Sequence, residues 1–202
     1  MHHSISSRLP VIAVCALIAA LGFATAATAQ TVTGQARAIQ TIVVNPLGGS
    51  TTTALADTGA LSGSTDAREA SSLDGSVTSI LAGNTLHATA IGWPDQVKSE
   101  ASIAGLSVTV GGATVGADFV LASASAVQGV PGAATVNING LVVNGVPITV
   151  TGNANQTITI PGGQVVINER PTGAIGTVVN ALHIAIGGVA DVLVASATAR
   201  VQ

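Results

Sequence analysis

The chain has 202 residues, of which 48% are hydrophobic, 7% charged and 1% aromatic, and its formal net charge is -3. Its six Lys and Arg side chains are scattered singly, so there is no basic patch to neutralise phosphates, which argues against nucleic-acid binding. High hydrophobicity with low net charge also argues against a disordered chain. A core is therefore expected, built from Val, Ile, Leu and Ala.

The amino terminus has the pattern of a secretory signal. Arg8 precedes the apolar run 11–21, and Ala27-Thr28-Ala29 forms a small-x-small cleavage site. We therefore predict that residues 1–29 are a cleaved signal peptide and that the protein is secreted. An uncleaved anchor is the alternative, although the apolar run is shorter than the ~20 residues of a membrane span.

The only cysteine, Cys15, lies within the apolar run. The mature chain 30–202 would then have no disulfide, no thiolate metal ligand and no Cys nucleophile. We also expect no integral membrane span after processing.

The mature chain has short strand-like segments separated by Gly, Asn and Pro. Residues 31–44 are predicted as one long strand or a strand pair. A Gly/Ser/Thr-rich loop is expected over 45–75, with residues 66–70 forming a short helical turn. From Ser76 onward the strand pattern is dense. The predicted strands there are 85–91, 102–110, 117–127, 135–138, 141–143, 146–151, 157–160, 164–168, 178–186 and 191–201.

Strands this short and evenly spaced favour a sandwich or a barrel. We predict an all-β fold over 30–202, a single β-sandwich of about nine to eleven mostly antiparallel strands. Residues 107–126 and 183–199 share an order of apolar strand, Gly-Gly turn, Asp and a run ending in Ala-Ser-Ala. Either the two hairpins arose by duplication, or two low-complexity hairpins converged.

Two strand segments, 119–122 and 192–195, are apolar on both faces. A strand of this kind is expected to be covered on both sides, by a second sheet, a loop or another molecule. The alternative is a central strand of the sandwich with small Ala side chains on its outer face.

The candidate ligand contacts are Trp93, His87 and His183. The two histidines are predicted on strands, on the face opposite the aliphatic residues, where they are either solvent-facing positions or a two-His metal site. Their separation in sequence does not match usual metal-ligand spacing. Trp93 could stack on a sugar ring if exposed, or anchor the core if buried.

The acidic residues suggest two further arrangements. Asp118 and Asp191 both follow Gly-Gly turns, as a carboxylate pair of a glycosidase might, although Asp is also common turn chemistry. Asp66, Glu69 and Asp74 could bind Ca²⁺ through oxygen atoms, but their spacing is not that of an EF-hand. We assign no catalytic residue, no metal site and no cofactor.

The carboxy-terminal half resembles the choice-of-anchor P family of secreted bacterial proteins. The segments that suggest it are 155–157, 161–163, 165–169, 179–183, 190–192 and 195–197, with Ala56-Asp57-Thr58-Gly59 nearer the amino terminus. The resemblance implies an exported domain whose relatives have differing carboxy-terminal anchors, and it supplies no catalytic residue. Here the sequence ends at Gln202 just after the last strand without a sorting motif, which favours free secretion or non-covalent association.

Taken together, these patterns predict a non-enzymatic secreted or cell-envelope protein with a structural or adhesive role. The alternatives are an extracellular carbohydrate-binding module and a secreted hydrolase using Asp118, Asp191 or the histidines. The expected partners are a second copy of the chain or a surface polysaccharide, because a chain with so few charges has little repulsion between copies.

Overall fold

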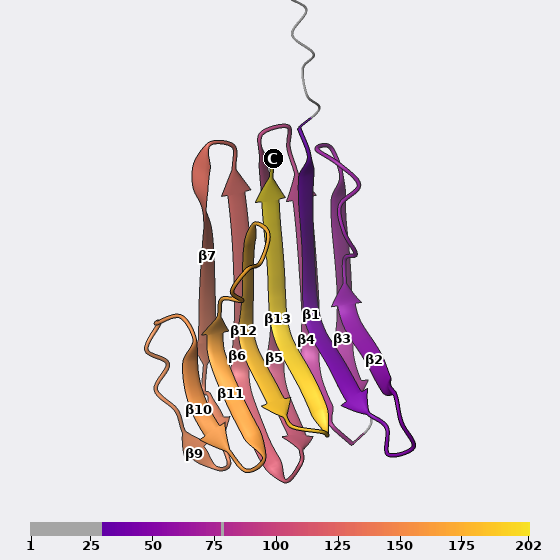
Figure 1. Cartoon of the computed structure of the whole chain (residues 1–202), viewed down its shortest axis with the longest axis vertical. Coiled ribbons are helices and arrows are strands. Elements are labelled where there is room, and N and C mark those ends of the chain that lie inside the picture. The colour runs from indigo at the N-terminus through magenta and orange to yellow at the C-terminus, as the bar shows by residue number, and fades with distance from the viewer. Residues whose placement is uncertain (1–29, 78) are drawn as a thin grey trace, which may run out of the picture.

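The computed structural model describes residues 30–77 and 79–202, and the predicted signal peptide lies outside them. Thirteen strands form two antiparallel sheets that lie one over the other (Figure 1). Their bounds are β1 Val32–Val44, β2 Ser50–Asp57, β3 Ala67–Val77, β4 Leu81–Gly92, β5 Gln96–Val110, β6 Ala113–Val127, β7 Val130–Asn139, β8 Val142–Val143, β9 Val146–Pro147, β10 Gln156–Ile160, β11 Gly163–Glu169, β12 Thr177–Ile186 and β13 Ala190–Val201. The described residues include no helix that could cross a membrane.

Sheet A has the order β10-β11-β12-β13-β1-β2, and sheet B has the order β3-β4-β5-β6-β8-β9, with β7 also pairing with β6. In sheet A the first strand, β1, lies between β2 and the last strand, β13, and pairs with both. The hairpins β5–β6 and β12–β13, which hold the repeated sequence pattern, are central in different sheets and pack against each other. Whether they arose by duplication stays a prediction.

The all-β prediction is confirmed, but two local predictions are wrong. Residues 45–75 are not a loop, since β2 and most of β3 lie there, and the expected helical turn at 66–70 is mostly part of β3. The strand count exceeds the predicted nine to eleven because of these two edge strands. Edge strands have one exposed face and one partner, so they have polar sequences that resemble loops.

The core lies between the sheets and differs in composition along the strands. Toward the chain termini its buried side chains are mainly alanines, and toward the β12–β13 turn they are Ile, Leu and Val. The alanine half includes Ala36, Ala38, Ala88, Ala90, Ala101, Ala122, Ala124, Ala197 and Ala199, and the aliphatic half includes Ile39, Leu86, Ile103, Val108, Val120, Leu182, Ile184 and Val192. In the alanine half a Cβ on Gly34 would come 2.7 Å from Val97 Cγ2, so the Val97 side chain of β5 packs directly against the backbone of β1 there.

One row of residues separates the two halves in sheet A. The strand registers place Ala56, Ala38, Ala195, Ala181 and Asn168 side by side across β2, β1, β13, β12 and β11. We call these five residues the kink row. Three of them, Ala56, Ala195 and Asn168, have positive φ angles of 46°, 49° and 52°.

The kink row reverses the alternation of side chains along each strand. In β1, Ala38 and Ile39 are consecutive buried residues, as are Val194 and Ala195 in β13. The register continues unshifted across the row, so no residue is inserted as it would be in a β-bulge. As a consequence, residues three apart that flank the row lie on the same outer face, which a regular strand does not allow.

Candidate functional site

The kink row assembles a polar cluster on the outer face of sheet A. His183 of β12 lies between two carboxylates, with Nδ1 2.7 Å from Glu169 Oε1 and Nε2 2.9 Å from Asp191 Oδ2. Asn180 Nδ2 donates to the other Glu169 oxygen, Oε2, at 2.6 Å. We call Glu169, His183 and Asp191 the acid–histidine brace, because it links β11, β12 and β13.

Strand geometry explains why these side chains meet. Asn180 lies directly opposite Glu169, and Asp191 is a diagonal neighbour of His183, which pairs with Leu193. Asn180 and His183 are three residues apart, and they share a face only because Ala181 and Leu182 both point inward.

Both ring nitrogens of His183 have a carboxylate partner, which fits the protonated imidazolium with two N–H donors. Burial acts to lower the pKa of His183, but the hydrogen bonds and negative charges of Glu169 and Asp191 outweigh it, and the pKa is raised above the ordinary histidine value of 6.5. The His183 side chain is 20% exposed, so the imidazolium is only partly reached by water.

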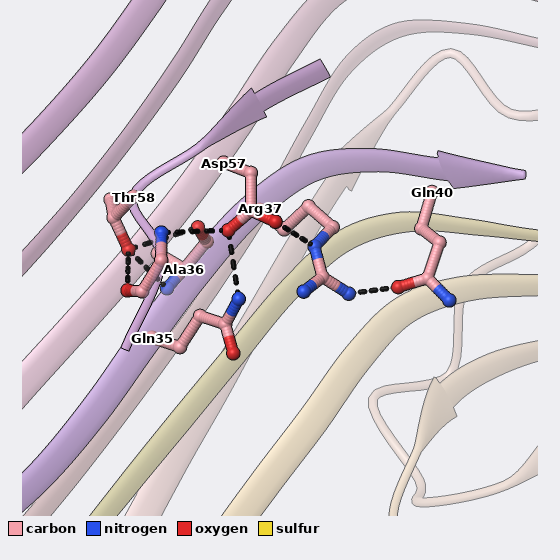
Figure 2. Close-up of polar contacts among 7 residues, drawn as sticks. Gln35, Ala36, Arg37, Gln40, Asp57 and Thr58 are labelled. Atoms are coloured by element: carbon pink, nitrogen blue, oxygen red, sulfur yellow. Dashed lines mark hydrogen bonds and ion pairs between the residues drawn. The ribbon is translucent and has the colours of Figure 1, made fainter. Parts of the chain in front are cut away.

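A second polar cluster lies across the kink row from β2 to β1 (Figure 2). Arg37 Nε donates to Asp57 Oδ2 at 2.7 Å, Gln35 Nε2 donates to Asp57 Oδ1 at 2.8 Å, and Arg37 also contacts Gln40. Burial acts to raise the pKa of Asp57, but hydrogen bonds from Gln35, Gly59 and Arg37, together with the Arg37 charge, lower it. Every polar group named here has a partner within the protein.

A polar recess beside the brace is the hollow that most resembles a binding site. It has a volume of about 440 Å³ and lies where β10 and the end of β11 meet. Its polar lining includes Asn155, Thr157, Glu169 and Arg170. Arg170 Nη2 also donates to the backbone oxygen of Ala134 in β7 at 2.8 Å, and burial lowers the Arg170 pKa.

The structure does not bring the three predicted ligand contacts together. His87 is on the outer face of sheet B, 3.5 Å from Glu69, whereas His183 is on the outer face of sheet A. A two-His metal site is therefore not formed. Trp93 lies in the turn after β4 and is 38% exposed, so it is not the core anchor that its size favoured.

The other two acidic arrangements are not formed either. Asp118 is on β6 in sheet B and Asp191 on β13 in sheet A, both facing outward, so they cannot flank one sugar bond. Asp66 instead accepts hydrogen bonds from the Ser62 backbone N–H and from Arg68 and Ser62 side chains, which lower its pKa to about 2. Within residues 30–77 and 79–202, no three His, Cys, Asp or Glu side chains are placed to bind a metal ion.

The two strands that are apolar on both faces are central strands, β6 and β13. Val120 and Val194 are fully buried, while Leu121 and Leu193 point outward and are partly exposed. No second layer covers their outer faces in the described part of the chain. The outer faces have Leu side chains rather than the small Ala of the alternative.

Sequence reasoning singled out His183 and Asp191 without pairing them, and it missed Glu169 and Asn180. Glu169 and Asn180 join it only because of the kink row, whereas Asp191 is an ordinary diagonal neighbour of His183. The row has no glycine in its positive-φ positions to mark it. A faint signal is present in β11 and β12, where four consecutive residues are buried and the period-two pattern fails.

The chain was compared with protein-family models, curated proteins and solved structures, and none of the three comparisons gave a match. The resemblance to the choice-of-anchor P family therefore stays a prediction.

Proposed function

We propose that the protein is a non-enzymatic structural or adhesive protein, exported from the cytoplasm and either released or held non-covalently at the envelope. In this proposal the mature chain is a single β-sandwich. The support at the sequence level is the signal-like amino terminus and a mature chain with no cysteine.

The acid–histidine brace is the observation that most favours this proposal. A general base needs a ring nitrogen free to take a proton from the substrate. Both nitrogens of His183 are instead bonded to carboxylates from neighbouring strands. An arrangement of this kind favours a role in holding β11, β12 and β13 together.

The experiment compares the mature chain, residues 30–202, with the His183→Gln variant on ester, peptide and glycoside substrates. The proposal expects no turnover by either protein and a lower unfolding temperature for the variant. His87→Gln is the matched control, since His87 is more exposed and has only one partner at 3.5 Å. Turnover that disappears in His183→Gln while the variant remains folded would refute the proposal.

A carbohydrate-binding module is the second candidate, because Trp93 is 38% exposed and the recess beside Glu169 is polar. Sugar rings stack on exposed aromatic side chains and hydrogen-bond to such polar groups. The two features belong to different sheets, however, so one glycan chain would have to reach around the molecule to use both.

Trp93 is the only tryptophan, so its fluorescence reports directly on a bound sugar. The structural proposal expects the emission to be unchanged when polysaccharides are added to the mature chain. A saturable shift in emission, lost in Trp93→Ala, would favour the carbohydrate-binding candidate instead.

A further inference from the structure

Charged side chains are distributed unevenly over the two long sides of the molecule. The fifty residues 119–168 contain no Asp, Glu, Lys, Arg or His. They form all of β7, β8, β9 and β10 and most of β6 and β11, which lie together on the left of Figure 1. On the right of that view, β2 and β3 include Asp57, Arg68, Glu69 and Asp74.

The longest edge strand on the uncharged side is β7. It pairs only with β6, so alternate backbone N–H and C=O groups along its other edge have no strand partner. Nine of its ten residues are exposed or partly exposed, and only Ile138 is buried. One carbonyl on β7, that of Ala134, accepts from Arg170.

Natural proteins usually protect such an edge with charged side chains, proline or a short strand. The opposite edge strand, β3, has three charges of this kind, whereas β7 has ten residues, no charge and one proline near its start. Exposed apolar side chains accompany it, with Val130 60% exposed at its start and Val146 58% exposed in β9.

We propose that β7 is a dimerisation edge, at which β7 of one copy pairs antiparallel with β7 of a second copy and joins the two B sheets. This inference rests on the proposed structural role and names its partner. A second copy fits because it presents the same strand without charged residues, and the guanidinium nearest that edge, Arg170, already donates to the Ala134 carbonyl.

The charge distribution also sets the form of the assembly. A head-to-tail contact of β7 with β3 would place Arg68, Glu69 and Asp74 against a strand with no complementary charge. The two-fold β7–β7 contact is self-complementary and closes on itself. We therefore expect dimers and not filaments.

The test is sedimentation velocity of the mature chain over a range of concentrations, compared with the Thr135→Lys/Asn137→Lys variant. Both side chains are exposed, so the fold is retained, and circular dichroism checks this. Ser50→Lys/Thr52→Lys on β2 is the matched control, with the same added charge on an exposed edge of the other side. We expect a dimer for the unaltered chain and the control, and dimerisation at least tenfold weaker for the β7 variant.

Three results would overturn the inference: a monomer at all concentrations, equal weakening in both lysine variants, or a ladder of higher oligomers. Co-sedimentation with cell envelopes is measured separately on the same proteins. A monomer that still binds envelopes would defeat only the dimer, and a β7 dimer that does not bind them would count against the adhesive role.

Discussion

At the scale of single residues, His183 shows how a strand position acquires a chemical property that its sequence neighbours do not predict. Its partners Glu169 and Asp191 come from the strands on either side, and together they favour the protonated imidazolium at a partly buried position. A neutral imidazole would leave either Glu169 Oε1 or Asp191 Oδ2 without its His183 donor. Protonation and strand association are therefore linked at this site.

The linkage gives a pH dependence with a definite sign. The folded pKa of His183 is raised above the ordinary histidine value of 6.5, so folding favours the protonated form. Its stabilising contribution is fully present below about pH 6.5, the unfolded-chain value, and is lost as the pH rises through the folded pKa. In chemical denaturation near pH 6, the free energy of unfolding of the unaltered chain should therefore exceed that of His183→Gln by about 1–3 kcal/mol.

That difference should shrink as the pH rises, while the free energy of unfolding of His87→Gln should stay close to that of the unaltered chain at every pH. A difference that grew with rising pH would show that the brace holds a neutral imidazole. The same experiment would then assign the stabilisation to packing around His183.

Ser99 provides a second test at the residue scale. It is 1% exposed in β5, between the sheets, and its hydroxyl has no hydrogen-bond partner in the described part of the chain. A buried hydroxyl without a partner costs about 1–3 kcal/mol, so Ser99→Ala should raise the free energy of unfolding by about 1 kcal/mol. An exposed control, Ser107→Ala, should change it by less than about 0.5 kcal/mol. A loss of stability in Ser99→Ala would show that the hydroxyl is satisfied.

At the scale of strands, the kink row determines which side chains share the outer face of sheet A. Non-glycine residues seldom adopt positive φ, and such backbone persists only where its surroundings impose it. Here the row coincides with the change from an alanine-lined core to one lined by Ile, Leu and Val. We attribute the kink to this change in side-chain size across five strands.

A pair of matched substitutions tests the row. Ala195 and Ala197 are both fully buried in β13, but only Ala195 has positive φ, at 49°. Valine at either position overpacks the core, which costs about 1–3 kcal/mol. Ala195→Val should lower the free energy of unfolding by about a further 1–2 kcal/mol, because the valine side chain clashes with the left-handed backbone. Equal losses in thermal or chemical unfolding would mean that Ala195 is not held in that conformation.

The strands that the sequence predicted well are those buried on one face, because their period-two pattern reports directly on burial. In β4, Leu86, Ala88 and Ala90 point inward and His87 and Thr89 outward, as the alternation predicted. The edge strands β2 and β3 were missed because their Thr, Ser and Gly content matches loops. The brace could not be predicted, since it depends on the pairing of β11, β12 and β13 and on a reversed alternation at the kink row.

At the scale of the whole molecule, the arrangement of charge distinguishes the two long sides. Ion pairs lie between β1 and β2, beside β3, on β5 and at the brace, while residues 119–168 contain no charged side chain. Such a chain is held together by backbone ladders and aliphatic packing more than by surface ion pairs, which contribute little individually. This composition suits a protein that works through surfaces and edges.

The most direct test of the proposed role is co-sedimentation of the purified mature chain with envelopes isolated from the producing cells. The envelopes are then washed and their soluble material is analysed by mass spectrometry. A structural or adhesive protein should bind saturably, stay intact and release no new envelope fragments with time. Failure to bind would contradict the adhesive, envelope-held form of the proposal, and a time-dependent release of fragments that stops in the folded His183→Gln variant would contradict the proposed function as a whole.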